Sequence, residues 1–264
     1  MAEGDSLVRI ARKLRPALLN REIVAASAPN QRSSLRVNAR RLEGRTVEAI
    51  ETRGKHLLIH LDGGLSLHSH LGMNGGWRID DGRGFGRPDR SAWLLIDAEL
   101  PGASKPVRVG QFGGTTLRLV RTPELARDPR LASLGPDILD SGFDLETASA
   151  RLRSSTDEIG TALLDQKLVC GIGNIFKSEA CFEAGIDPWR PASSLVRSDD
   201  ADEGVRLLEI ARGQMLAAVE TGKRPGRVYR KSGRPCFRCR LTRIRSRGQG
   251  DDNRTTYWCP ACQS

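Results

Sequence analysis

Four cysteines near the end of the chain restrict its fold more than any other feature. They form the pattern Cys236-x2-Cys239-x19-Cys259-x2-Cys262. Two CxxC pairs at this spacing match a four-thiolate zinc site, in which the protein fills every position of a tetrahedral ion. Residues 241–244 and 255–258 are rich in β-forming side chains, and Gly248 and Gly250 lie between them. The pattern predicts a β-hairpin zinc finger whose single Zn²⁺ is structural, because no position remains for water or substrate.

A pair of disulfides is the alternative use of these cysteines, and it requires an oxidising compartment. Residues 1–5 are acidic and lack the basic-then-apolar order of a secretion signal. The chain also has no uninterrupted apolar run of membrane-spanning length. We therefore expect a cytoplasmic monomer with reduced thiols and no membrane partner, in which Cys170 and Cys181 are small buried residues.

Positive charge is concentrated in the same region as the cysteines. The chain has 42 Lys and Arg against 32 Asp and Glu, and residues 222–264 alone contain 12 basic and 2 acidic residues, which is the whole excess of +10. Tyr229, Tyr257 and Trp258 are interspersed among them. A solvated basic tail is the alternative interpretation. Basic and aromatic residues on a metal-stabilised fold favour a surface that binds nucleic-acid phosphates.

The order of the expected elements predicts an α+β fold. A helix from Asp5 to about Leu19 precedes short β-type runs at 46–52, 56–61, 65–71, 92–96, 107–111 and 115–120. Helical segments follow at 145–152, 159–168, 174–184 and 201–220. We expect an antiparallel β-sandwich with one leading helix over residues 1–122, a helical domain over 123–225 and the zinc finger over 226–264.

The helical domain contains the string Gly171-Ile-Gly-Asn174 between two helical segments. This order predicts a helix–two-turn–helix layout whose second helix begins at Asn174. Glycines let the backbone approach a partner closely, and a helix start presents N–H groups to an oxyanion such as a DNA phosphate. A tight connection between packed helices, capped by Asn174, is an equally good interpretation.

Together these strings resemble the formamidopyrimidine-DNA glycosylase / endonuclease VIII family over nearly the whole chain. The matching motifs are Glu3-Gly4-Asp5, Arg53-Gly-Lys55, Ser69-His-Leu-Gly-Met73, Gly171-Ile-Gly-Asn174, Val228-Tyr229, Asn253-Arg254 and Tyr257-Trp-Cys-Pro-Ala-Cys-Gln263. The last motif, and the short stretch 221–227 before Val228, look more like endonuclease VIII than its purine-specific relatives. The resemblance implies excision of oxidised pyrimidines from double-stranded damaged DNA.

The resemblance also implies roles for individual residues. The family's N-terminal amine attacks C1′ of the damaged nucleotide, expels the base through an imine and breaks the strand by β/δ-elimination. Glu3 matches the general acid/base, and Lys55 matches the lysine that holds phosphate and sugar. Four residues match positions that bind phosphates around the extruded nucleotide: His70, Asn174, Tyr229 and Arg254. Met73 matches the wedge that fills the gap in the base stack.

The chain departs from the family at its nucleophile, because Ala2 replaces the proline. Removal of Met1 would expose a primary amine on Ala2, which can still form an imine. We expect Ala2 to be the nucleophile of a bifunctional glycosylase/AP lyase. There are three alternatives. The activity of Ala2 is weakened, Lys55 replaces it as the nucleophile, or the protein binds damaged DNA without catalysis.

A second departure is Gln111, which stands where purine-specific relatives place an arginine beside the orphaned base. We expect Phe112 to reach DNA as a second wedge, with a core phenylalanine as the alternative. All four histidines fall between residues 56 and 70, and we expect polar positions near DNA there instead of a second metal site.

Overall fold

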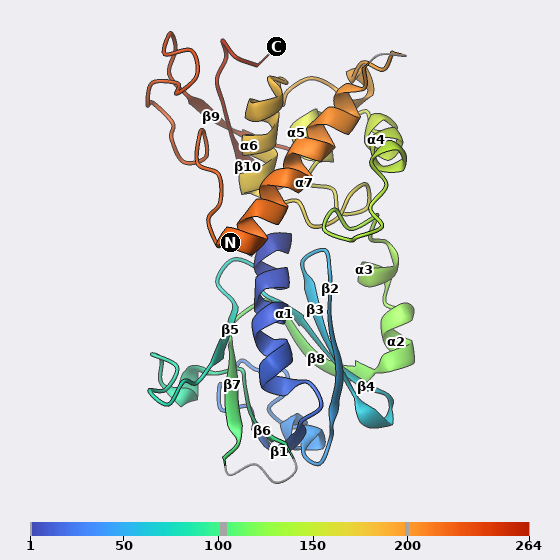
Figure 1. The fold of residues 1–264 in the computed structure, drawn as a ribbon, viewed down its shortest axis with the longest axis vertical. Helices are drawn as coiled ribbons and strands as arrows, with labels where there is room; N and C mark the ends of the chain where they lie inside the picture. Colours follow the sequence, from blue (N-terminus) through green and yellow to red (C-terminus); the bar gives the residue numbers. More distant parts are fainter. Residues whose placement is uncertain (1, 101–104, 199–200, 264) are drawn as a thin grey trace. The chain divides into compact units, whose positions relative to one another are not determined.

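The computed structural model describes residues 2–100, 105–198 and 201–263, which form two compact units (Figure 1). The first unit contains residues up to 132 except Glu3–Asp5, and the second contains Glu3–Asp5 and the residues from 133 onward. The α+β class is confirmed. The further division of the chain into three domains remains a prediction.

Two antiparallel four-stranded sheets build the first unit. One sheet has the order β1-β6-β7-β5 and the other the order β2-β3-β4-β8. Their strands are β1 Glu22–Ser27, β2 Val47–Arg53, β3 His56–Leu61, β4 Leu65–His70, β5 Gly76–Ile79, β6 Leu94–Glu99, β7 Val107–Phe112 and β8 Thr116–Arg121. The inward residues of both sheets share one apolar core, as in a sandwich.

Helix α1 (Gly4–Leu18) supplies one side of this core, which confirms the predicted leading helix. Leu7, Leu14 and Leu18 recur at helical spacing and are buried among the strands. Figure 1 shows the helix lying along the strands in blue.

Strands β1 and β5 were not expected from the sequence. In β1 the pairing with β6 shifts register between Ile23 and Ala25, so its buried positions do not alternate. Strand β5 has only 4 residues and begins with Gly76. Neither segment therefore shows the period of two that identifies a strand. Two short helices, α2 (Thr122–Ala126) and α3 (Pro129–Ala132), end the unit.

The second unit is helical around a core formed mainly by α6 and α7. Its helices are α4 Leu145–Arg153, α5 Ile159–Ala162, α6 Asn174–Ala184 and α7 Glu203–Thr221. Helix α5 ends earlier than the expected 159–168, and turns lead from it to α6. Helices α6 and α7 both end at a glycine in the left-handed region, Gly185 and Gly222, which is a common helix stop.

Strands β9 (Arg245–Gln249) and β10 (Arg254–Trp258) form the hairpin expected among the cysteines. The expected first strand at 241–244 is wrong, because that segment belongs to a cysteine turn. The amide of Cys236 donates to the Thr242 carbonyl at 2.8 Å, and Leu241 is 84% exposed. None of the helices formed by the described residues combines the length and apolarity of a membrane span.

Candidate functional site

Ala2 lines a cavity in the sandwich unit. Its nitrogen, which follows Met1 in the chain, donates to the Gly72 carbonyl at 3.4 Å. The cavity has a volume of about 300 Å³, and Ser6, Arg9 and Met73 also line it. The Met73 side chain is 54% exposed, which a wedge residue requires. The predicted amine and the predicted wedge therefore line one cavity.

Glu3 is completely buried and caps the start of α6. Its Oε1 accepts the Ile175 amide at 2.8 Å, and its Oε2 accepts the Phe176 amide at 3.4 Å. Helix-start N–H groups and the helix dipole stabilise a negative charge at this position. The sequence predicted an oxyanion at the start of this helix and took DNA phosphate as the ligand. In the structure Glu3 accepts these two N–H groups.

Two glycines allow this arrangement. The Gly171 carbonyl accepts the Gly4 amide at 2.9 Å, and Gly171 has a φ of +102°, which other residues rarely adopt. At Gly173 a Cβ atom would lie 2.3 Å from Glu3 Cγ. The glycine motif therefore holds the Glu3 segment of its own chain.

Lys55 and His70 lie at the same end of the β2-β3-β4-β8 sheet. Lys55 follows Gly54, which has a φ of +58°, in the turn from β2 to β3. His70 ends β4, and its Nδ1 lies 2.7 Å from the Thr115 hydroxyl. Burial lowers the pKa of His70, and the positive charges of Lys55 and Arg130 lower it further. Two predicted DNA-contacting residues thus share one electropositive surface.

The predicted phosphate contact Asn174 is mostly buried at the start of α6. Its Nδ2 donates to the Thr255 carbonyl of β10 at 2.8 Å, while its Oδ1 has no hydrogen-bond partner among the described residues. The side chain therefore joins α6 to the hairpin.

The backbone around Tyr229 is held by a residue that sequence analysis missed. Glu179 on α6 is buried, and its carboxylate accepts the amides of Arg227, Val228 and Tyr229 at 2.8, 3.0 and 2.8 Å. The Tyr229 ring packs edge-on against Tyr257 at 5.2 Å. The sequence shows a glutamate within the helix that begins at Asn174, but one sequence alone does not show which backbone groups this glutamate binds.

Arg254 begins β10 and lines a cavity of about 250 Å³ in the second unit. Its Nε lies 3.8 Å from an Asp252 oxygen, and its side chain is 43% exposed. Lys177, also missed, lines the same cavity, and its Nζ donates to the Thr256 hydroxyl at 2.6 Å. Burial lowers the pKa of Lys177 to about 8.

Phe112 is only 2% exposed and packs edge-on against Phe85 at 5.3 Å. In this structure Phe112 therefore packs as a core phenylalanine, and its contact with DNA stays a prediction. Gln111 is fully buried, and its amide nitrogen donates to the Gly113 carbonyl. Neither side chain is presented to an opposite base in this conformation.

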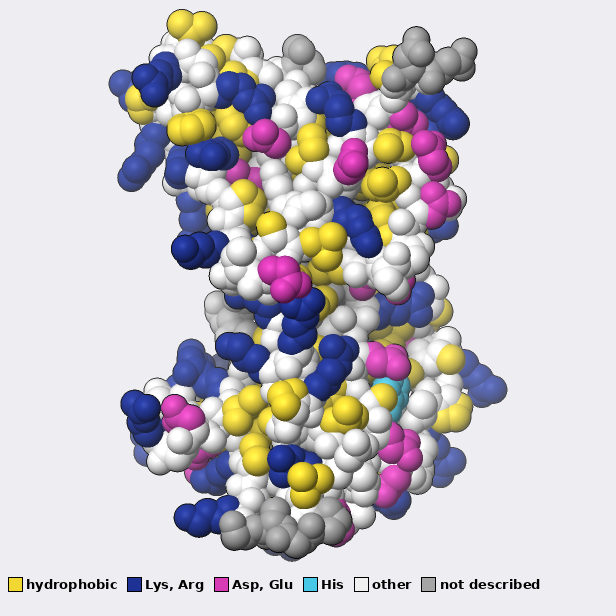
Figure 2. Space-filling model, in the orientation of Figure 1, with side chains coloured by type: hydrophobic (Ala, Val, Ile, Leu, Met, Phe, Trp, Pro, Cys, Tyr) yellow, Lys and Arg dark blue, Asp and Glu magenta, His cyan; other side chains and the backbone are white. Residues whose placement is uncertain are grey.

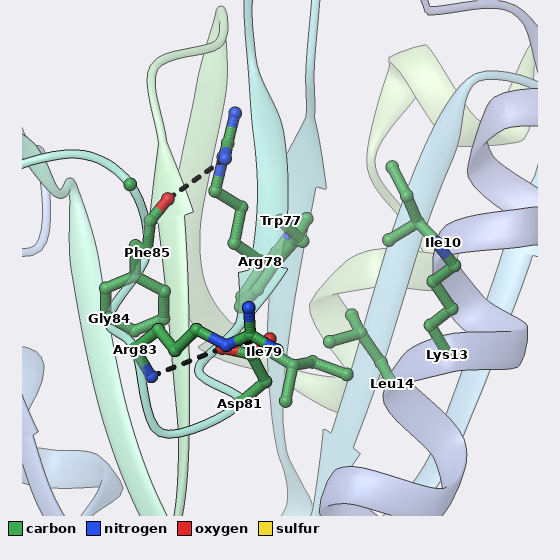
Figure 3. A pocket seen from close by; sticks show the side chains of 11 residues that line it. Ile10, Lys13, Leu14, Trp77, Arg78, Ile79, Asp81, Arg83, Gly84 and Phe85 are labelled. Atoms are coloured by element: carbon green, nitrogen blue, oxygen red, sulfur yellow. Dashed lines mark hydrogen bonds and ion pairs between the residues drawn. The ribbon is translucent and has the colours of Figure 1, made fainter.

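A larger cavity of about 580 Å³ lies between α1 and the segment that follows β5. Figure 3 shows Ile10 and Leu14 of the helix facing Trp77 and Ile79 of the strand. No predicted site residue lines it.

The four cysteines converge in the finger, with their sulfur atoms all within 4.8 Å of one another. The Cys239–Cys259 and Cys236–Cys262 sulfur distances are 3.7 and 3.8 Å. A tetrahedral ion with metal–sulfur bonds of about 2.3 Å would separate its ligands by about 3.8 Å, whereas a disulfide needs about 2.05 Å. The geometry therefore fits one metal ion held by four cysteines.

The electrostatics of these thiols are consistent with a cation. Backbone N–H groups of Thr242 and Leu241 lower the pKa of Cys239 to about 6. Burial and the three neighbouring sulfur atoms raise the pKa of Cys262 to about 12. Four thiolates this close repel one another unless a cation lies among them. Among the described residues, no other cluster of three or more His, Cys, Asp or Glu has this geometry.

Basic side chains gather on the visible face of the finger, at the upper left of Figure 2, with hydrophobic side chains among them. Arg227, Arg238 and Arg247 also lie over aromatic rings, at 4.1, 4.5 and 3.8 Å from the centroids of Phe237, Phe182 and Trp189. Such contacts hold the guanidinium groups in place on the surface.

Comparisons with known proteins agree with this geometry. Residues 1–111 match the formamidopyrimidine-DNA glycosylase N-terminal domain, and residues 134–228 match the formamidopyrimidine-DNA glycosylase H2TH domain. A probable endonuclease 8 2 of Streptomyces coelicolor is 37% identical over 279 residues, covering 100% of this chain and 94% of the relative. A formamidopyrimidine-DNA glycosylase of Thermus thermophilus is 32% identical over 285 residues, covering 100% and 98%.

Solved structures show the same fold. The crystal structure of the MutM (Fpg) protein from Thermus thermophilus superposes with a TM-score of 0.80 at 28% identity, covering 99% of this chain and 98% of that one. The Lactococcus lactis Fpg bound to abasic-site DNA gives a TM-score of 0.82 at 24% identity, with 100% of both chains covered. The chain therefore belongs to the formamidopyrimidine-DNA glycosylase / endonuclease 8 family of base-excision repair glycosylases.

Proposed function

We propose that this protein is a bifunctional DNA glycosylase and AP lyase that removes oxidised pyrimidines from double-stranded DNA. The observation that carries the proposal is the buried carboxylate of Glu3, which two amides at the start of α6 hold in place directly after Ala2 in the chain. A carboxylate held next to the N-terminal residue is what an imine mechanism needs for its proton transfers.

The proposed chemistry begins with the α-amine of Ala2 after removal of Met1. An α-amine has an ordinary pKa near 8, so more of it is uncharged at pH 7 than of a lysine. Its nitrogen bonds to C1′ as the bond from C1′ to the base breaks, and the base departs with a proton. Glu3 exchanges protons with the opening sugar, and the resulting imine acidifies C2′. Loss of that proton and a further elimination expel the 3′ and then the 5′ phosphate.

DNA contacts are proposed for Lys55, His70, Tyr229 and Arg254, with Met73 filling the gap left by the extruded nucleotide. Lys55 and His70 lie at one end of the same sheet, and Arg254 lies on the basic finger. Asn174 remains a proposed contact through its second amide hydrogen, because one hydrogen already binds Thr255. A single Zn²⁺ is proposed for the four cysteines, as a structural ion.

The pyrimidine preference rests on the chain between α7 and Val228. Helix α7 ends at Thr221, which leaves only residues 222–227 before Val228. Purine-specific relatives carry a longer loop there, which covers a flipped oxidised guanine. The short connection therefore favours the smaller pyrimidine lesions.

A non-catalytic protein that binds damaged DNA is the second candidate. It is favoured by Ala2 in place of proline and by Met1, which blocks the amine if it is retained. This candidate predicts affinity for abasic DNA without strand cleavage.

A panel of duplexes with an oxidised pyrimidine, an oxidised purine or an abasic site separates the two candidates. Glu3→Gln should lower excision about 10²- to 10⁴-fold while DNA binding persists, because it removes a general acid/base. Glu22→Gln, on an exposed position of β1, is the matched control and should keep full activity. Turnover by the wild type eliminates the non-catalytic candidate, and equal activity of both variants rejects the role of Glu3.

A further inference from the structure

The outer face of the β2-β3-β4-β8 sheet carries polar side chains, as is usual in a sandwich, but some of them, such as Ser66 and His68, are fully buried. Side chains alternate along a strand, so His56 and His60 of β3 share a face with His68 and His70 of β4. The pairing places His56 opposite His70, and it places His68 opposite Arg118 of β8. Three imidazoles and a guanidinium thus lie side by side on adjacent strands.

Arg118 determines which nitrogen of His68 carries the proton. Its Nε donates to His68 Nδ1 at 3.1 Å. A guanidinium can only donate, so Nδ1 must supply a lone pair and His68 must be neutral with its proton on Nε2. Arg118 is itself held by an ion pair with Asp128, which is largely buried.

His68 in turn determines the protonation of His56. The His68 Nε2 lies 2.8 Å from His56 Nδ1. Because His68 carries its proton on Nε2, it is the donor in this bond and His56 Nδ1 is the acceptor. A neutral His56 therefore carries its proton on Nε2, on the side of the ring that faces away from His68.

The burial of both rings agrees with these neutral forms. Burial, helped by the neighbouring histidines and the positive charges of Arg118 and Arg130, lowers the pKa of His56 to about 3 and that of His68 to about 4. At neutral pH the series of hydrogen bonds from Arg118 through His68 to His56 therefore leaves one oriented donor, the Nε2–H of His56.

This donor lies beside two residues that the proposed function places at DNA phosphates. The rings of His56 and His70 have centroids 4.8 Å apart, and Lys55 directly precedes His56. We propose that His56 is a further phosphate-binding residue, which donates Nε2–H to the DNA backbone next to His70 and is oriented by His68 and Arg118. The inference rests on the proposed DNA contacts of Lys55 and His70.

Affinity for a duplex with a tetrahydrofuran abasic-site analogue tests the contact. His56→Phe keeps a ring but removes the donor, and it should weaken binding about 10- to 150-fold, the usual range for one hydrogen bond to a charged group. The dependence of affinity on salt should not change, because a neutral imidazole releases no counterion. His60→Phe is the matched control on the same strand and face. His60 contacts Ser66 and Glu51 instead, and its variant should bind within about 2-fold of wild type.

Rescue separates the donor from a packing role. The amide nitrogen of glutamine can reach the position of Nε2, whereas that of asparagine can reach only the position of Nδ1. His56→Gln should therefore recover most of the affinity, and His56→Asn should not. Unchanged affinity of His56→Phe, or equal recovery by both amides, would overturn the proposal.

Long-range ¹H–¹⁵N NMR spectra of the free protein show which ring nitrogen of each histidine is protonated. They test the hydrogen bonds from Arg118 to His56 independently of activity. At pH 7 both His56 and His68 should be protonated on Nε2, and Arg118→Met should convert His68, and with it His56, to a mixture of tautomers. A proton on His56 Nδ1 in the wild type would overturn the proposal. If the wild-type protein cleaves no DNA but His56→Phe still weakens its binding, the proposed catalysis is refuted and the proposed His56 contact is not.

Discussion

Gly173 is the single residue on which the position of Glu3 depends most directly. A Cβ atom there would lie 2.2 Å from Glu3 Cδ, so Gly173→Ala must displace the carboxylate. Misplacement of a catalytic group by about 1 Å costs on the order of 100-fold in rate, and we expect a loss of that size. Gly213→Ala is the matched control, because nothing lies within 4 Å of its Cβ position on α7.

The control should also raise the melting temperature, since alanine in a helix interior is favoured over glycine by about 1 kcal/mol. Thermal unfolding and cleavage of abasic DNA measure both effects. Full activity of Gly173→Ala would contradict the placement of Glu3.

The protonation of His68 predicts how stability depends on pH. Its pKa falls from 6.5 in the unfolded chain to about 4 in the fold, chiefly through burial. The folded state therefore binds fewer protons, so stability is greatest above pH 6.5 and falls as the pH decreases toward 4. One such group contributes a slope of up to about 1.4 kcal/mol per pH unit. Urea unfolding at pH 7.5, 6 and 5 measures it. A His68→Gln variant with the same pH dependence as wild type would contradict this assignment.

Residues differed in how far the sequence could predict them. Glu3 and Met73 were named from motifs. In the structure the carboxylate of Glu3 caps the start of α6, and the side chain of Met73 is exposed. Phe112 was expected at DNA, but its burial depends on Phe85, a partner 27 positions away that no local pattern reveals. Glu179 and Lys177 were missed for the same reason, because their partners lie much later in the chain, at residues 227–229 for Glu179 and at Thr256 of the hairpin for Lys177.

At the scale of elements, the finger is the part whose fold we expect to depend on the proposed ion. Its small core consists of Phe182, Val228, Ile244 and the cysteines themselves, which is too little apolar surface to fold without the metal. Chelation or Cys259→Ser should therefore release one zinc ion, unfold the hairpin and abolish DNA binding.

Cys181→Ala is the matched control for the finger, because Cys181 is buried on α6 and is not a member of the cluster. It should retain one zinc per chain and its DNA affinity. Zinc content, circular dichroism and binding of abasic DNA measure the three effects. Retained affinity in the metal-free protein would contradict the role of the finger.

Elements with a strong period were predictable, and irregular ones were not. Helix α1, α6 and the strands from β2 to β4 appear where hydrophobic spacing placed them. Strand β1 was not predicted because a bulge breaks the alternation of its buried and exposed residues. Helix α5 is shorter than predicted because turns replace its expected second half. In the finger, the cysteine turn at 236–242 includes Leu241 and Thr242, whose β propensity suggested a strand.

At the scale of the whole molecule, the excess positive charge predicts how binding responds to salt. Each neutralised phosphate contributes a slope of about −0.9 to log K against log salt concentration. Arg254→Ala should weaken binding to damaged and undamaged duplexes alike and reduce the slope by about one such contribution. Arg197→Ala, an exposed arginine of the same unit outside the finger, is the control and should keep the slope. An unchanged slope for Arg254→Ala would remove this residue from the phosphate contacts.

The proposed catalysis depends on a free α-amine at Ala2, and borohydride trapping tests that amine most directly. Reduction of the imine should leave a covalent bond between abasic DNA and the protein, and peptide mapping by mass spectrometry locates it. With Met1 removed, the account predicts a cross-link on Ala2, and none when the chain keeps Met1 or is acetylated. A cross-link on Lys55, or equal strand cleavage by the blocked protein, would contradict it.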